Sequence, residues 1–347
     1  MKVTSNTRAL SKSGVRSITA ASVALGLLAA GQTALAQHEG DKALSVQQLR
    51  DLAGTNHWAV YPDNPVLRPG VKDEWDAGAV GSMTVLKVGE VFHMYYEAWG
   101  APHGGNRGLD YRTLQIGHAT SRDGVHWTKD PANPVLPKGD GKDWDKDGSW
   151  DPFVLYENGV FKMWYGGGMD RHCEWGYAVS TDGVKFVKKG QISHLGDVED
   201  DHVAHDNASG RYFMYYCDRK IEGGGLVCAQ SPNETDFDFA HAAQIHIDGM
   251  KYPDSYKFSH VFQDAGQWHM FFAADVSWRT GYATSPDGLH WTARNPNLFL
   301  GQDGEVIKVA DDLWLMYFGP PGLFDKVDCD VRLALYKGKL ADMTPKK

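Results

Sequence analysis

A short aromatic segment with a central methionine occurs five times in this chain, and this repetition restricts the fold more than any other feature. The copies lie at residues 92–96, 161–165, 212–216, 268–272 and 314–318. Aromatic residues are enriched in β-strands, and a tight turn such as Glu157-Asn158-Gly159 marks a hairpin. Each copy is therefore predicted to be the second strand of a β-hairpin, usually followed by a Gly- or Ala-rich third strand.

Two further patterns repeat between these hairpins. A Ser-x-Asp-Gly-x-x-aromatic turn occurs at residues 121–127, 180–186 and 285–291, with a degenerate copy at 231–237. A longer block at residues 57–76 contains His-Trp, Asn-Pro-Val-Leu and Trp-Asp, and the same residues recur 69 positions later, at 126–145. Because several markers recur together, one structural unit has been copied along the chain.

The repeats predict an all-β fold, namely a five-bladed β-propeller of four-stranded blades, because five copies follow one another at a period near 50–60 residues. The fifth copy ends near residues 332–336, with little chain left for an outer strand. The segment 57–67 resembles an outer strand with no blade before it, so we expect this N-terminal strand to close the fifth blade. The propeller is expected over residues 56–347, after an N-terminal arm at 37–55.

Residues 1–36 have the pattern of a secretory signal peptide. Four basic residues precede an apolar run at 18–30, and Ala34-Leu35-Ala36 offers small residues for cleavage. The apolar run is shorter than the about 20 residues that a membrane-spanning helix needs. We therefore expect a periplasmic or secreted protein with no membrane insertion after the signal is cleaved.

The charge of the mature chain argues against nucleic acid as a partner. Removing residues 1–36 removes four positive and no negative charges, so the formal net charge falls from −9 to −13. Phosphate backbones repel such a surface, whereas neutral sugars are not repelled. The 12 Trp and 15 Tyr offer aromatic faces for a carbohydrate substrate, with packing inside the sheets as the other explanation for them.

Export permits disulfide bonds between the four cysteines. Cys217 and Cys228 flank a glycine-rich turn and form one candidate pair, and Cys173 and Cys329 form another. Sequence spacing does not determine the connectivity. The sequence contains no Cys-x-x-Cys, which argues against a zinc cluster.

Acidic residues recur near the start of the predicted inner strands, which line the central channel of a propeller. When the copies are aligned on the methionine, Asp151 matches Ser82 of the first copy and Asp200 of the third. In the fifth copy, the nearest glutamate lies one place from the position of Asp151. Clustered carboxyls suit acid/base catalysis, which needs one protonated and one ionised group. The catalytic candidates are Asp151, Asp200, Glu199, Glu305 and Asp76, the last just before the first inner strand.

Other side chains near the predicted channel are candidates for substrate binding. His202 and His260 align with Phe153 on inner strands, where an imidazole can bind substrate, transfer a proton, ligate a cation or simply fill the channel. Trp99 ends a hairpin and is expected either to stack on a sugar or to pack in the core. The binding candidates are Trp150, His202, His260, Trp99, Lys257 and Arg279, the last two as partners for an acidic sugar.

The motifs together resemble a known group of enzymes. Trp150-Asp151-Pro152 with its hairpin, the Ser-x-Asp-Gly-x-x-Trp turns and the Asn-Pro-Val-Leu segments resemble the five-bladed propellers of glycoside hydrolase families 43, 32 and 130, over most of residues 57–340. The resemblance implies catalysis by carboxylates of the inner strands. It implies Asp151 as the acid of an Asp-Pro motif, Glu199 or Asp200 as the acid of the next blade, and Glu305 or Asp76 as the third acid. We expect no required cofactor, although the resemblance to family 43 allows a structural calcium ion in the channel.

These observations predict an exported glycoside hydrolase that cleaves oligo- or polysaccharides by carboxylate acid/base catalysis. Two alternatives stay open. One is a polysaccharide lyase for uronate-containing glycans, in which His202 or His260 is the base and Lys257 or Arg279 neutralises the uronate. The other is a propeller that binds glycans without turning them over.

Overall fold

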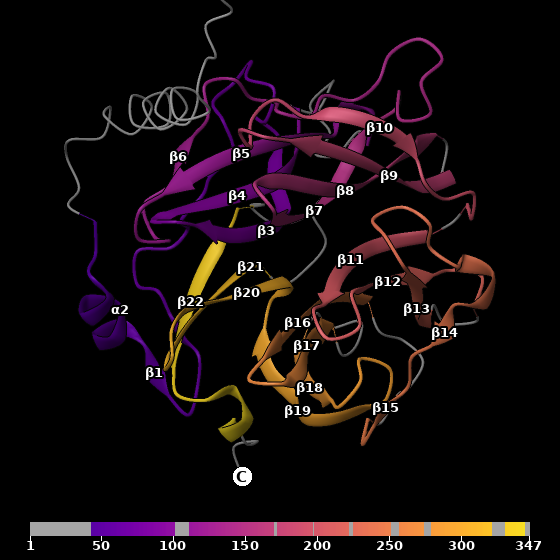
Figure 1. Ribbon diagram of the computed structural model, residues 1–347. Coiled ribbons are helices and arrows are strands. Elements are labelled where there is room, and N and C mark those ends of the chain that lie inside the picture. The colour runs from indigo at the N-terminus through magenta and orange to yellow at the C-terminus, as the bar shows by residue number, and fades with distance from the viewer. Residues whose placement is uncertain are drawn as a thin grey trace, which may run out of the picture. The chain divides into compact units, whose positions relative to one another are not determined.

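The strands of this protein form five separate sheets (Figure 1). The computed structural model describes residues 43–100, 111–169, 172–196, 198–221, 225–250, 257–273, 279–320 and 330–343. Each sheet is one blade of a β-propeller, so the prediction of an all-β, five-bladed fold is confirmed. The expected signal peptide, residues 1–36, lies outside the described residues. Among those that are described, no helix has the length and apolar character needed to cross a membrane.

The blades follow one another along the chain, each beginning with its inner strand. Blade 1 contains β3 (Ala79–Val88), β4 (Val91–Trp99), β5 (Gln115–Ser121) and β6 (Thr128–Lys129). Blade 2 contains β7 (Ser149–Glu157), β8 (Val160–Met169), β9 (His172–Ser180) and β10 (Val187–Gln191). Blade 3 contains β11 (Val198–Asp206), β12 (Arg211–Asp218), β13 (Gly225–Ser231) and β14 (Ala243–Gln244).

The last two blades each have a fifth strand. Blade 4 contains β16 (Lys257–Asp264), β17 (Gln267–Ala273), β18 (Arg279–Ser285) and β19 (Trp291–Leu300), with β15 (Ile247–Asp248) beside β19. Blade 5 contains β20 (Gln302–Ala310), β21 (Leu313–Gly319) and β22 (Arg332–Lys337), with β1 (Gly54–Thr55) and β2 (Ala59–Val60) from the N-terminal side. The helices among the described residues are α2 (Val46–Leu52) and the short 3-10 turns η2 (Tyr111–Thr113), η3 (Phe239–His241) and η4 (Leu340–Asp342).

The repeated sequence markers are the two halves of one contact between blades. The five repeated methionines are fully buried in the second strands, and an aromatic residue follows each of them. Three of these aromatic residues donate a hydroxyl hydrogen bond of 2.7–2.8 Å to a glycine carbonyl in a Ser-x-Asp-Gly turn: Tyr95 to Gly183, Tyr215 to Gly288 and Tyr317 to Gly124. Each of these turns belongs to the next blade, and the Tyr317 bond joins blade 5 to blade 1, which closes the ring.

An N-terminal strand completes the fifth blade, as predicted. Strand β2 pairs antiparallel with β22. The side chain of Asn64 extends this pairing, because its Nδ2 donates to the carbonyl of Leu333 at 2.8 Å and its Oδ1 accepts from the N–H of Leu333 at 2.7 Å. The segment expected as an arm also contributes, since β1 pairs parallel with β22 and helix α2 buries Leu49 in the core.

We expect Asn64→Leu to destabilise the protein by roughly 2–5 kcal/mol, because it leaves two backbone groups of Leu333 without partners. Asn133 makes the equivalent pair of bonds to His118 within blade 1, so Asn133→Leu is a matched control. Urea unfolding measures the cost of each change. Limited proteolysis should cut residues 54–67 faster in Asn64→Leu only, and equal cleavage in both variants would contradict a special role in closure.

One disulfide considered from the sequence does not form. Cys228 is buried and takes part in no disulfide bond, which rules out its pairing with Cys217. The register gives the reason: Cys217 lies opposite Leu226 and Cys228 opposite Tyr215, so the two cysteines are diagonal neighbours. Diagonal neighbours are about 7–8 Å apart, beyond the usual Cα separation of a disulfide. Cys329, the expected partner of Cys173, lies outside the described residues.

Candidate functional site

A β-bulge interrupts the inner strand of every blade near the same place. The pairing with the second strand shifts between Gly81 and Met83, Trp150 and Phe153, Glu199 and His202, Lys257 and Ser259, and Gln302 and Glu305. Four bulges hold a non-glycine residue with positive φ, namely Ser82 at 23°, Asp151 at 44°, Asp200 at 61° and Asp303 at 53°. Aspartate adopts a positive φ more readily than most residues. Bulges commonly redirect side chains beside active sites.

The register corrects the alignment of the fifth copy. The sequence alignment put Glu305 one place from the position of Asp151, but Asp303 is the residue at the equivalent bulge. Glu305 lies two residues further along, opposite Tyr317, in the way that Phe153 lies opposite Trp164. It therefore belongs to a second level of the channel, beyond the bulges. We call it the lower level, and it is formed by Thr84, Phe153, His202, His260 and Glu305.

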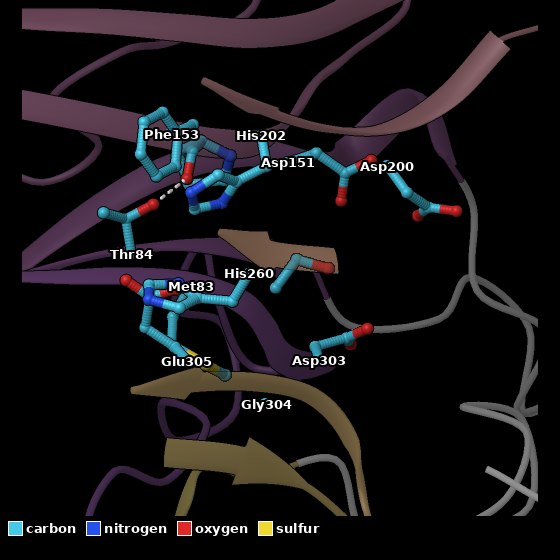
Figure 2. A pocket seen from close by; sticks show the side chains of 12 residues that line it. Met83, Thr84, Asp151, Phe153, Asp200, His202, His260, Asp303, Gly304 and Glu305 are labelled. Carbon is cyan, nitrogen blue, oxygen red and sulfur yellow. Dashed lines mark hydrogen bonds and ion pairs between the residues drawn. The ribbon is translucent and has the colours of Figure 1, made fainter. Parts of the chain in front are cut away.

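Both levels line a single recess at the centre of the ring. Its empty volume, counted out to open solvent, is about 470 Å³. Figure 2 shows Asp151, Asp200 and Asp303 toward one end of this recess, and His202, His260 and Glu305 toward the other. A second hollow of about 1090 Å³ shares the five residues of the lower level, so that level is the floor of both. The structure thus brings together five of the predicted site residues: Asp151, Asp200, His202, His260 and Glu305.

A buried carboxyl pair forms the wall beside the bulge of blade 2. Glu97 on β4 is only 4% exposed, and its Oε2 accepts a hydrogen bond of 3.1 Å from the backbone N–H of Asp151. Burial, followed by the charge of Asp151, raises the pKa of Glu97 well above its ordinary value. Two buried carboxyls in contact cannot both ionise cheaply, so the pair retains one proton over a wide pH range.

Several groups favour Asp151 as the ionised member of this pair. Burial raises the pKa of Asp151, but hydrogen bonds from the Ser82 side chain, the Asp200 backbone N–H and the Glu97 side chain all oppose that rise. The positive charge of Arg219, an exposed residue after β12, acts in the same direction. These causes favour Glu97 as the protonated member of the pair and Asp151 as the carboxylate.

Asp303 is the most isolated acid of the recess. Neither of its carboxyl oxygens has a hydrogen-bond partner among the residues that the structure describes. Burial, together with the nearby charge of Asp151, raises the pKa of Asp303 to about 8. A carboxyl in this environment keeps its proton at neutral pH, whereas the hydrogen bonds to Asp151 favour the ionised form of that acid. Pairs of acids whose environments separate their pKa values are the arrangement that acid/base catalysis needs.

The lower level contains two histidines and a glutamate in mutual contact. The Nε2 atom of His202 contacts the carbonyl of Val261 at 2.8 Å, and Nδ1 of His260 contacts Oε2 of Glu305. The other oxygen of Glu305 accepts from the backbone N–H of Val85 at 3.1 Å. Burial lowers the pKa of His202 well below its ordinary value, so this ring is neutral. The ring of Phe153 packs on it with the centroids 3.9 Å apart.

Three predicted residues lie in structural positions instead. Asp76 is 2% exposed and forms an ion pair of 2.5 Å with Lys129 of the outer strand β6. Asp145 makes the same contact with Lys188 in blade 2, so this acid is a repeated clamp between the loop and the outer strand. Trp99 is 2% exposed in a small core cluster, and Trp150 packs against that cluster with its indole over Gly166.

For the remaining predicted residues the structure describes the backbone but not the side chain. Glu199 lies in β11 beside Asp200, Lys257 begins β16, and Arg279 begins β18. Their side chains lie outside the described part of the chain. Their roles as catalytic or binding residues stay predictions.

The sequence reasoning missed Glu97, Asp303 and Arg219. A signal for Glu97 was present, because the equivalent positions of the other second strands are Gly166, Cys217, Ala273 and Gly319. A lone acid where the other copies carry small residues indicates a special role. Asp303 was hidden by a second register shift in blade 5, between Lys308 and Ala310, which adds a residue to the count between methionine and acid.

The donor set of the lower level does not fit the calcium ion that the resemblance allowed. Calcium prefers six to eight oxygen ligands at 2.3–2.6 Å. The described residues at this level offer two imidazoles and one carboxylate, and the hydroxyl of Thr84 is already engaged with the carbonyl of Pro152 at 2.5 Å. Two imidazoles and one carboxylate are too few oxygen ligands for calcium.

Comparison with known sequences gives relatives without an assigned function. No protein-family model matches the chain. The uncharacterized protein MT1551 of Mycobacterium tuberculosis (strain CDC 1551 / Oshkosh) is 24% identical over 254 residues, which are 67% of this chain and 79% of that protein. The uncharacterized protein Rv1502 of strain ATCC 25618 / H37Rv is 25% identical over 256 residues, with the same coverage of 67% and 79%.

Comparison with solved structures supports the fold. A putative glycosidase from Bacteroides thetaiotaomicron has a TM-score of 0.63 at 15% identity, over 81% of this chain and 97% of that chain. β-1,2-Mannobiose phosphorylase from Listeria innocua has a TM-score of 0.62 at 14% identity, over 80% and 96%. A thermostable family-43 glycoside hydrolase has a TM-score of 0.59 at 16% identity, over 82% and 94%. The likeness to this group of propellers extends over nearly the whole of each neighbour.

Proposed function

We propose that this protein is an exported glycosidase that hydrolyses glycosidic bonds of an oligo- or polysaccharide in the central recess. The observation that carries the proposal is the set of three aspartates, Asp151, Asp200 and Asp303, on equivalent bulges around that recess. Glycoside hydrolysis needs a protonated and an ionised carboxyl on either side of the scissile bond. The signal-peptide pattern of residues 1–36 supports export, which would bring the protein to polymeric glycans.

In this mechanism Asp151 is the ionised carboxylate. Glu97 keeps the shared proton behind it, and the backbone N–H of Asp200 holds it in place. Asp151 then activates a water molecule as general base or attacks the anomeric carbon as nucleophile. Asp151 has a positive φ at this bulge and lines the recess.

We assign proton donation to the leaving sugar oxygen to Asp303. Its carboxyl is buried, lines the recess and lies in the field of the Asp151 charge, which favours the protonated form. Asp200, on the bulge of blade 3, is the third carboxyl and is assigned to sugar hydroxyl groups and to the orientation of Asp151 through its N–H.

The similar structures support a sugar substrate as a class. Their names include a glycosidase, a glycoside hydrolase and a mannobiose phosphorylase, so propellers of this shape are found among proteins that act on glycosidic bonds. Fold alone does not fix a reaction, and the argument for catalysis therefore rests on the three aspartates.

The test is the release of reducing ends from a panel of plant and bacterial glycans, with and without inorganic phosphate. We expect release without phosphate, and a loss of about 10²-fold or more in Asp303→Asn, whose backbone φ of 53° asparagine tolerates. Release that requires phosphate would indicate phosphorolysis. A product with near-ultraviolet absorption that depends on His260 would indicate a lyase, and binding without any product would indicate a glycan-binding propeller.

A further inference from the structure

Three potential metal ligands meet at the centre of the channel. His202, His260 and Glu305 come from the inner strands of three successive blades, at equivalent positions of the register. One ligand atom from each residue lies within 4.8 Å of those of the other two (Figure 2). All three side chains line the recess, which provides an entry path for an ion.

Two of the three side chains are already oriented by the backbone. The Nε2–H of His202 points to the carbonyl of Val261 at 2.8 Å, which leaves Nδ1 as the nitrogen with a lone pair. The backbone N–H of Val85 holds Oε1 of Glu305 at 3.1 Å, which leaves Oε2 toward the histidines. Metal-binding histidines and carboxylates generally have such outer contacts, which fix the tautomer and the direction of the lone pair.

The contact between His260 and Glu305 completes the cluster. Nδ1 of His260 and Oε2 of Glu305 are hydrogen-bond partners, and their side chains are only 10% and 6% exposed. A cation can replace this hydrogen bond, because an imidazole nitrogen and a carboxylate oxygen are both metal ligands.

We propose that His202, His260 and Glu305 form a binding site for one divalent first-row transition metal ion of the zinc class. Two imidazoles and one carboxylate are a ligand set used by zinc, whereas calcium requires many oxygens. Two zinc–ligand bonds of about 2.0–2.1 Å span at most about 4.2 Å. The ligand atoms all lie within 4.8 Å of one another, so a closure on the order of 1 Å brings them to zinc-bonding distance. This site is separate from the three aspartates of the proposed function and does not depend on it.

The test uses Co²⁺ as a spectroscopic substitute for Zn²⁺ in the full-length protein after treatment with EDTA. We expect one equivalent of Co²⁺ to give visible d–d absorption that Zn²⁺ abolishes and that an excess of Ca²⁺ leaves unchanged. Zn²⁺ should also raise the melting temperature, because it binds the folded state, and Ca²⁺ should raise it less.

Variants separate this site from the other histidines. Glu305→Gln and His260→Gln should each weaken Co²⁺ binding by at least about 100-fold, since even outer-shell changes cost 10–100-fold. His269→Gln is the control, because His269 is buried in the same blade and bonds Tyr282 outside the cluster. Near-ultraviolet circular dichroism checks that each variant is folded. The absence of saturable binding, or binding that a folded Glu305→Gln retains, overturns the proposal.

Discussion

Asp151→Asn is expected to lower kcat/KM on the glycan substrate by about 10³-fold or more while the propeller stays folded. Asparagine lacks the negative charge that activates water or attacks the anomeric carbon, and loss of such a group costs on the order of 10²–10⁴-fold. The fold should survive because asparagine, like aspartate, tolerates the positive φ of 44° at this bulge. The backbone bond to Glu97 is also retained, since it comes from the N–H of residue 151.

A matched control separates the charge from the backbone conformation. Asp73 also has a positive φ, 74°, and is exposed outside the recess. Asp73→Asn makes the same chemical change in the same type of conformation and should leave kcat/KM unchanged. Steady-state kinetics and urea unfolding on the two variants provide the comparison. If a folded Asp151→Asn keeps its turnover, Asp151 is not the catalytic carboxylate.

Glu97→Gln is expected to stabilise the protein at pH 8 and to have little effect near pH 4. The pKa of Glu97 is raised in the folded state by burial and by the charge of Asp151. As the pH rises above about 4.3, the unfolded chain releases this proton while the folded protein keeps it, so stability falls with increasing pH. Glutamine removes this loss, which amounts to about 1.4 kcal/mol for each unit of raised pKa.

Glu157→Gln should show the opposite trend and serves as the control. Burial opposes ionisation of Glu157, but hydrogen bonds from Lys162, Tyr212 and His205 outweigh it and lower its pKa. The stability that this group contributes is present above its unfolded pKa and is lost as the pH falls through its folded pKa. Urea midpoints from pH 4 to pH 8 should therefore rise relative to wild type for Glu97→Gln and fall for Glu157→Gln. Parallel curves for Glu97→Gln and wild type would show that Glu97 is ionised in the folded state.

The activity of Glu97→Gln tests which member of the pair holds the proton. The amide of glutamine can donate to Asp151 as the protonated Glu97 does, and its oxygen can accept the Asp151 N–H. We therefore expect kcat within about tenfold of wild type, well above the 10²–10⁴-fold loss typical of a missing acid or base. A loss as large as that of Asp151→Asn would make Glu97 the proton carrier of the reaction.

The sequence alone determined the architecture, because each blade carries its own local signals. Hairpin turns, the repeated methionines and the Ser-x-Asp-Gly turns are short-range features, so their repetition specified five blades and an N-terminal closing strand. The sequence also indicated that Asp151 and Asp200 lie at equivalent places on inner strands. These two residues share one recess because copies of a unit place equivalent residues around one axis.

The tertiary structure decided which acids face each other. Strand β20 contains an extra residue at a second register shift, between Lys308 and Ala310, so counting from the methionine selected Glu305 where Asp303 occupies the bulge. Glu97 reaches Asp151 from a second strand of another blade, 54 residues away in the chain. Asp76 is neutralised by Lys129 of an outer strand, 53 residues away. Local pattern cannot specify such contacts, because a side chain's partner and its burial, and hence its pKa, depend on packing between segments that are distant in sequence.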